Sequence, residues 1–255
     1  MSPEHVVVLA AAFGAGLIDA MAGGGGLIQL PALFAAFPQA PHTTLLGTGK
    51  LAGLAGTLSA ASRYLLHVRV DRRFVLPAAV CAFAGAPLGA WIATQVAPQR
   101  FRALVPVLLC VVLAVTLLRR NFGRQHAPRV AGRGAIFAAA AGAGAIGIYD
   151  GFFGPGTGTF LVFLFIQVAG CDFLHASASA KLVNAAANAA ALAMFGLTGE
   201  IYWLLGFAMA ACGLIGAQLG SHLAIRRGSG FVRAAFIVVV AALIAKTASD
   251  ALRSG

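Results

Sequence analysis

Two lysines and two aspartates, Lys50, Lys181, Asp19 and Asp150, stand within long apolar stretches of this chain of 255 residues. If those stretches cross a membrane, each ionised lysine costs at least about 2.5 kcal/mol to insert and needs a partner for its charge. The partner is either an anionic substrate or the aspartate of the same half of the chain; the third interpretation is that the side chain snorkels to the membrane surface. The first two are compatible, because a lysine neutralised at rest still offers its charge to an anion.

Amide and hydroxyl side chains accompany the two lysines. Asn184 and Asn188 follow Lys181 at intervals of three and four residues, so a helix would place all three on one face. Hydroxyl groups lie nearby at Thr48, Thr57, Ser177 and Ser179. Such groups bind oxyanion oxygens without adding charge, and hydrogen bonding between neighbouring helices is the alternative role. Because the lysine of the first half lacks such neighbours, we expect Lys181→Gln to weaken anion binding more than Lys50→Gln.

A run of glycines follows each aspartate, Gly23–Gly26 in the first half and Gly154-Pro155-Gly156-Thr157-Gly158 in the second. A helix that restarts after such a break offers unpaired N–H groups and the positive end of its dipole, which suit an anion. The candidate binding positions are therefore Gly24, Gly25, Gly26, Gly156, Thr157 and Gly158.

Glycines also let helices approach one another closely in lipid, which is the alternative explanation for both breaks. For Gly85 and Gly89, and for Gly216 and Gly220, close packing is the main interpretation. A valine at Gly156 is accordingly expected to block anion binding in a folded protein, whereas a valine at Gly220 is expected to impair folding.

Several other chemistries are excluded. The segment 47–51 lacks the first glycine of a P-loop at position 44 and the Ser or Thr that should follow Lys50. The four cysteines lie far apart, and no Cys/His spacing predicts a zinc site or a disulfide framework. No arrangement of serine, histidine and acid indicates a hydrolase. The sequence predicts no catalytic residue, no metal and no cofactor, and therefore not an enzyme.

The composition places these residues in a membrane. Hydrophobic residues make up 60% of the chain and charged residues 10%, against about 45–50% and 25% in soluble proteins. The mean hydropathy is +0.90. The net charge of +11 comes mainly from arginines in short loops near 69–73, 119–133 and 226–233, which predicts cytoplasmic loops. This pattern excludes nucleic acid as the partner and predicts an all-α, multi-pass membrane protein in contact with lipid.

Six stretches are long enough to be full spans: about 43–66, 74–97, 103–118, 175–197, 201–224 and 231–249. Two further stretches, 5–37 and 134–169, are broken by the glycine runs. As a helix, the first would be about 50 Å long, more than one crossing of about 30 Å and less than two. A re-entrant hairpin fits this length.

The two halves of the chain resemble each other. Asp19 and Asp150 are 131 residues apart, and so are Lys50 and Lys181. We interpret the chain as two repeats, 1–124 and 125–255, each with one broken element and three spans, about eight membrane elements in all. An odd number of full spans makes the repeats inverted and brings all three basic loops to one face. If the broken elements cross once instead, the repeats are parallel and the third basic loop lies opposite.

The residues around the first break, Gly16-Leu17-Ile18-Asp19-Ala20-Met21-Ala22-Gly23-Gly24-Gly25-Gly26-Leu27-Ile28-Gln29-Leu30-Pro31, followed by Gly47-Thr48-Gly49-Lys50-Leu51, resemble the TauE/SafE sulfite exporter family. The second copy, with Gly154–Gly158 and Ala180-Lys181-Leu182-Val183-Asn184, is similar. The chain departs from the family pattern at Gly49, where the family would have Asn. The resemblance implies a bacterial inner-membrane protein that moves sulfite, organosulfonates or other sulfur oxyanions without ATP.

The sequence and the resemblance together predict a secondary transporter, an exporter, of small sulfur-containing anions that works by alternating access around a midplane site. Its binding residues would be Lys50, Lys181, Asn184, Asn188, Thr48, Ser179 and the six break positions, with Asp19 and Asp150 in a structural or proton-coupling role. A passive anion channel is the nearest alternative, and a sulfur relay through Cys81 and Cys212 is a second. Proton coupling and a homodimer stay open.

Overall fold

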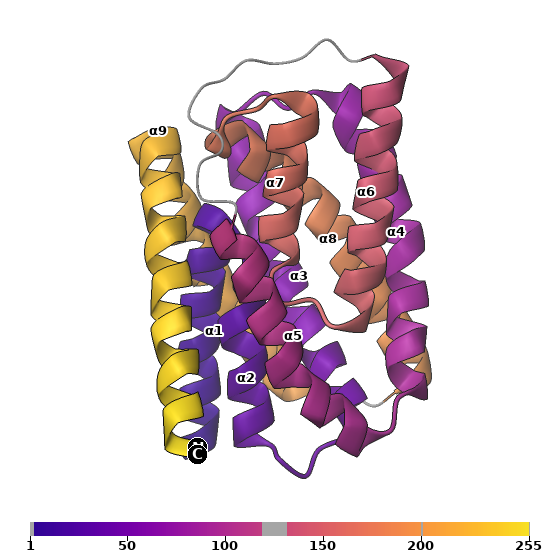
Figure 1. The fold of residues 1–255 in the computed structure, drawn as a ribbon, viewed down its shortest axis with the longest axis vertical. Coiled ribbons are helices and arrows are strands. Elements are labelled where there is room, and N and C mark those ends of the chain that lie inside the picture. The colour runs from indigo at the N-terminus through magenta and orange to yellow at the C-terminus, as the bar shows by residue number, and fades with distance from the viewer. Residues whose placement is uncertain (1–2, 119–131, 200, 255) are drawn as a thin grey trace.

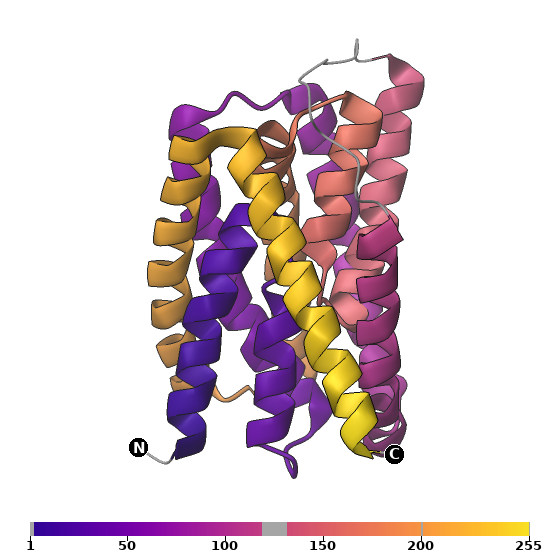
Figure 2. The same ribbon diagram turned by 60° about the vertical axis from the view of Figure 1, so that its left-hand side comes forward.

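Every regular element in the described part of the chain, residues 3–118, 132–199 and 201–254 of the computed structural model, is a helix. The elements are α1 (Pro3–Ala22), α2 (Gly26–Ala36), α3 (His42–His67), α4 (Arg72–Gln95), α5 (Pro98–Leu118), α6 (Arg133–Phe152), α7 (Thr157–Ala169), α8 (Phe173–Thr198) and α9 (Trp203–Ser254). The last of these reverses direction at Gly228, whose φ of 70° and ψ of −172° are not helical, so its two parts lie in different directions (Figure 2).

Within the described residues, five helices are long and apolar enough to cross a membrane: Pro3–Met21, Arg72–Gln95, Arg133–Phe152, Phe173–Thr198 and Trp203–Gly228. The protein is thus an all-helical, multi-pass membrane protein, as predicted. Three of the five correspond to predicted full spans, and the other two form the first part of each predicted broken element. The predicted spans 43–66 and 103–118 form α3 and α5, and 231–249 falls in the second part of α9.

Both predicted breaks are present. Helix α1 ends at Ala22 and α2 begins at Gly26, while α6 ends at Phe152 and α7 begins at Thr157. Helix α1 runs from one end of the molecule into its interior and α2 returns toward that end, whereas α6 and α7 do the same from the opposite end (Figures 1 and 2). This chain path is the one that inverted repeats with re-entrant hairpins require. The duplication itself, with a boundary at 124/125, stays a prediction.

The ends of the helices also agree with the hairpin hypothesis. The α3–α4 connection, the start of α6 and the reversal within α9 lie at one end of the molecule (Figure 2). These sites carry Arg69–Arg73, Arg133 and Arg226–Arg227. The remaining basic loop, at 119–131, lies outside the described residues. Helix α5, with Arg100 and Arg102 in its first turn, begins at the other end.

The two predicted glycine pairs are packing positions. Helix α4 packs along α6, and α1 packs along the first part of α9. A Cβ atom at Gly89 would lie 1.8 Å from the carbonyl oxygen of Ile148, and one at Gly220 would lie 2.2 Å from that of Leu17. A Cβ at Gly85 would lie 2.5 Å from the carbonyl oxygen of Gly144, and one at Gly216 would lie 2.1 Å from that of Phe13, so the prediction of close helix packing is confirmed.

The chain path predicts the sides from which two positions react. Gln39 is exposed in the connection between α2 and α3, and Arg133 is exposed at the start of α6. In a cysteine-free background, Gln39→Cys and Arg133→Cys should react with a membrane-impermeant maleimide from opposite sides of the membrane. If both react only from the same side, the broken elements are not re-entrant.

Close packing predicts a difference between two glycines. Gly89→Ala should lower the midpoint of thermal unfolding in detergent, because its Cβ would overlap backbone that no rotamer change can move. Gly14→Ala is the matched control, because no atom lies within 4 Å of its Cβ position, and it should leave that midpoint equal or higher. Equal unfolding midpoints for the two variants would contradict the packing role of Gly89.

Candidate functional site

A cavity lies where the two glycine breaks meet. It contains about 710 Å³ of empty space, including the part open to the surroundings, and is lined by residues of α1, α2, α3, α6, α7, α8, α9 and both breaks. The breaks contact each other directly, because a Cβ at Gly23 would lie 2.5 Å from the backbone of Gly158 and Thr159. Gly23 and Gly154 have φ of 81° and 95°, which glycine adopts without steric cost. The two re-entrant hairpins thus end at a common centre.

The two buried lysines form ion pairs that cross between the predicted halves. The Nζ atom of Lys50 lies 2.7 Å from Asp150 Oδ2, and that of Lys181 lies 2.7 Å from Asp19 Oδ2. Pairing within the same half, as considered from the sequence, is therefore wrong. The reason is geometric, because each hairpin places its aspartate against the helix that carries the lysine of the other half.

Lys181 and Asp19 form the more enclosed pair. The side chain of Lys181 is 1% exposed and donates a hydrogen bond to Asp19. The other carboxylate oxygen of Asp19 accepts the N–H of Gly25 at 3.3 Å, within the first break. Asp19 lines the cavity, whereas Lys181 stands behind it and does not. This pair attaches the first break to α8.

Lys50 and Asp150 both line the cavity. Their side chains are 7% and 3% exposed, and the ammonium group of Lys50 lies over the second break, 2.9 Å from the position of a Cβ at Gly154. Within the described structure, Asp150 Oδ2 is a buried oxygen that has the charge of Lys50 beside it but no aligned hydrogen-bond donor. Lys50 is therefore the lysine that faces the cavity. This reverses the expectation from the sequence, and Lys50→Gln is now expected to weaken anion binding more than Lys181→Gln.

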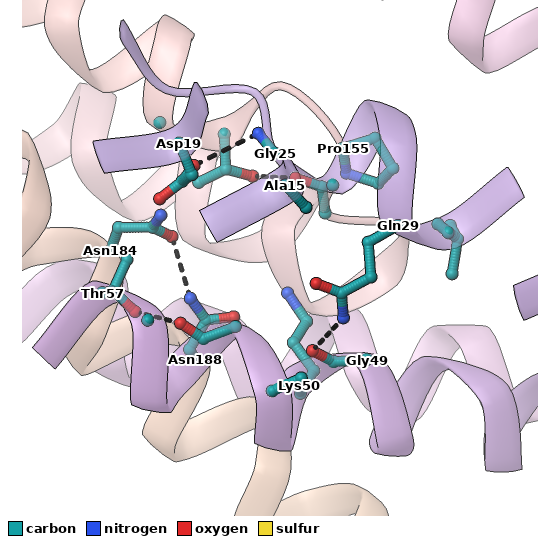
Figure 3. Close-up of a pocket in the computed structure, with 18 of the residues that line it drawn as sticks. Ala15, Asp19, Gly25, Gln29, Gly49, Lys50, Thr57, Pro155, Asn184 and Asn188 are labelled. Atoms are coloured by element: carbon teal, nitrogen blue, oxygen red, sulfur yellow. Dashed lines mark hydrogen bonds between the residues drawn. The ribbon is translucent and has the colours of Figure 1, made fainter. Parts of the chain in front are cut away.

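The predicted asparagines and Thr57 line the cavity, whereas Thr48, Ser177 and Ser179 do not. Asn188 donates from Nδ2 to Asn184 Oδ1 at 3.2 Å (Figure 3). Thr48 donates to the carbonyl of Thr44 and accepts the N–H of Tyr202, and Ser179 donates to the carbonyl of His175. The hydroxyls of Thr48 and Ser179 therefore serve helix contacts and lie outside the cavity.

The six predicted break positions all line the cavity: Gly24, Gly25, Gly26, Gly156, Thr157 and Gly158. The expectation for Gly156→Val changes, because a Cβ at Gly156 would lie 2.4 Å from Cγ1 of the buried Val112, and the φ of Gly156 is 87°. Valine there would disturb packing and backbone whether or not an anion binds. A comparison with Gly220→Val consequently cannot separate binding from folding.

Gln29 is a cavity residue that the sequence reasoning missed. Its side chain lies in the first turn of the apolar helix α2, and its Nε2 donates to the carbonyl of Gly49 at 3.0 Å (Figure 3). A Cβ at Gly49 would lie 3.6 Å from that same Nε2 atom. An amide side chain from α2 therefore occupies the space beside the position where the family pattern would have Asn. A lone amide between apolar residues was the available signal.

The cysteines considered for a sulfur relay lie away from the cavity. Cys81 on α4 contacts α6, where its Cβ is 3.4 Å from the position of a Cβ at Gly144, and Cys212 is partly buried on α9. Neither residue lines the cavity. Their placement is that of small packing residues.

Comparison with known proteins places the chain among membrane transporters. The family model described as sulfite exporter TauE/SafE matches residues 8–247. The chain is 38% identical over 242 residues to the probable membrane transporter protein ORF9 of Sinorhizobium sp, covering 94% of this chain and 90% of that protein. It is 34% identical over 236 residues to the probable membrane transporter protein YfcA of Escherichia coli K12, covering 92% and 86%. A probable membrane transporter protein of Haemophilus influenzae is 31% identical over 244 residues, covering 96% and 94%. No solved structure gives a significant match.

The enclosure of Lys181 predicts a structural role for its ion pair. Asp19→Asn should destabilise the protein by about 3–5 kcal/mol, because it leaves a buried ammonium without a counter-charge. The double variant Asp19→Asn/Lys181→Gln removes both charges and should recover part of that loss. The midpoint of thermal unfolding in detergent measures the order of stability. A double variant no more stable than Asp19→Asn would contradict the role of the pair.

Proposed function

The chain belongs to the sulfite exporter TauE/SafE family and is a membrane transporter, and we propose that it moves a small sulfur-containing anion such as sulfite or an organosulfonate. The observation that carries the proposal is Lys50, a buried lysine on the wall of a central cavity. Such a residue in a membrane protein marks a substrate or ion pathway by default. The family description supports the sulfur oxyanion.

The surroundings of Lys50 suit an oxyanion. The amides of Gln29, Asn184 and Asn188 line the same cavity and provide hydrogen-bond donors without charge (Figure 3). The hydroxyl of Thr57 also lines it, but its hydrogen is donated to the carbonyl of Gly53. Helices α2 and α7 begin at the cavity, and the positive ends of their dipoles favour an anion. These groups, together with the glycines of both breaks, form the proposed binding site.

The arrangement of the hairpins favours alternating access. Two re-entrant elements that enter from opposite ends and meet at a central site match a recurrent plan of secondary transporters. We place the basic end of the molecule in the cytoplasm of a bacterial inner membrane. Export is the direction that the family description favours. A passive anion channel could use the same site, and concentrative transport driven by an ion gradient separates the two functions.

The site predicts that anion exchange depends on Lys50. Purified protein in liposomes should exchange at least one of sulfite, methanesulfonate, sulfate and thiosulfate in a counterflow assay. Lys50→Gln should weaken the apparent affinity by about 2–5 kcal/mol, or roughly thirtyfold and more.

Arg69→Gln is the matched control, because it removes an exposed positive charge outside the cavity and should leave the affinity nearly unchanged. Equal affinities for wild type and a monodisperse Lys50→Gln protein would remove Lys50 from the site. No exchange of any of the four anions would contradict the proposed substrate class.

A further inference from the structure

The two ion pairs occupy equivalent positions in the predicted repeats but differ in their surroundings. In the Lys181 pair, Asp19 accepts hydrogen bonds from the ammonium group and from the N–H of Gly25. In the Lys50 pair the charges are equally close, at 2.7 Å, but Asp150 Oδ2 has no aligned donor among the described residues. The two pairs therefore differ in one respect: Asp19 also accepts a backbone N–H from the first break, in addition to its contact with the lysine.

The two lysines also differ in how directly an anion in the cavity can reach them. Lys50 and Asp150 both line it, so an anion inside can reach the ammonium group of Lys50 directly. Lys181 is covered by Asp19 and does not line it. An anion can therefore replace a carboxylate at Lys50 without disturbing the contact between the first break and α8.

The charges around the cavity determine what must accompany such a replacement. The ionisable residues among the described cavity lining are Asp19, Lys50 and Asp150. Lys181 stands behind Asp19, and the hydroxyl of Tyr149, next to Asp150, already donates to the carbonyl of Pro155. The two lysines balance the two aspartates, so an incoming anion leaves Asp150 ionised beside a like charge. In general, burial beside a like charge disfavours the ionised form of a carboxylate, and Asp150 is 3% exposed.

We infer that Lys50 and Asp150 form an exchangeable pair in which binding of one anion is coupled to uptake of one proton by Asp150. In the resting state the ammonium of Lys50 faces the ionised carboxylate of Asp150. The anion takes the place of the carboxylate at Lys50, and a proton from the aqueous phase neutralises that carboxylate. For a singly charged anion the total charge of the site is thereby conserved. The inference rests on the proposed function and deepens it, because it identifies Asp150 as the residue that couples the anion to a proton. Since the anion and the proton then move in the same direction, export by this route is driven by the outward gradient of the anion rather than by the inward proton gradient of a bacterial inner membrane.

The neighbours of Asp19 explain why this residue would not take up a proton when an anion binds. Its ionised form is stabilised by the hydrogen bonds from Lys181 and Gly25, and both donors stay in place when an anion occupies the cavity. Asp19 is thus the matched control for Asp150, with the same chemistry and an equivalent position in the other repeat.

The test counts the protons bound with the anion. Isothermal titration calorimetry of the detergent-purified protein with methanesulfonate and with thiosulfate, whose own charges do not change between pH 5 and 8, is run in two buffers of different ionisation enthalpy. Wild type should take up about one proton per anion, and its affinity should fall by up to tenfold per unit of rising pH. Asp150→Asn should bind the same anions with no proton uptake and no pH dependence, because the amide resembles the protonated acid.

Asp19→Asn should retain the proton uptake of wild type, whatever its loss of stability. Binding by wild type without proton uptake, or uptake that persists in Asp150→Asn, would overturn the inference and leave the proposed function standing. If neither anion binds and none of the four anions exchanges in liposomes, the proposed function and the inference both fail. Wild-type binding without proton uptake overturns the inference even if a variant does not fold.

Discussion

The structure depends on the cost of placing four ionised side chains in an apolar medium. Lys50 and Lys181 can stay charged only beside a carboxylate, and each finds one in the opposite half of the chain. Replacing such pairs by apolar residues is often neutral or stabilising, so their value lies in specificity rather than in net stability. Here the specificity concerns position, because both pairs form only when α1 and α6 end at the same central point. The two ion pairs therefore fix the position of one hairpin relative to the other.

Glycine makes that meeting possible. Bulkier residues at the two breaks would keep the hairpin ends apart, because the backbone of Gly23 lies against that of Gly158. The same residue type has another role along the α4–α6 and α1–α9 contacts, where it brings carbonyl oxygens within reach of the facing helix. Helices that cannot rely on the hydrophobic effect in lipid gain their association from such close contact. A rigid outer pairing of helices thus supports a centre composed of short, interrupted ones.

The near-symmetry of the centre is broken by a few side chains. Where the second half has Asn184 and Asn188, the first half has Gly53 and Thr57, so the amides approach the cavity from one side. Gln29 supplies an amide from the other side, next to Gly49. The result is one lysine that faces the cavity and one that is covered. Equivalent positions in the two predicted repeats can therefore have different chemistry, because each side chain meets a different set of neighbours.

Composition and spacing alone determined the environment and the outline of this protein. Sixty per cent of hydrophobic residues requires a membrane, the glycine runs after Asp19 and Asp150 require broken helices, and a buried lysine requires a counter-charge. Spacing also placed Asn184 and Asn188 on one helical face, since that depends only on local geometry. Tertiary structure decided three further features: which aspartate pairs with each lysine, that Lys50 rather than Lys181 faces the cavity, and that Gln29 lines it. They depend on how the hairpins cross, and a linear sequence records the position of a residue along its helix but not the neighbours that another helix brings to it.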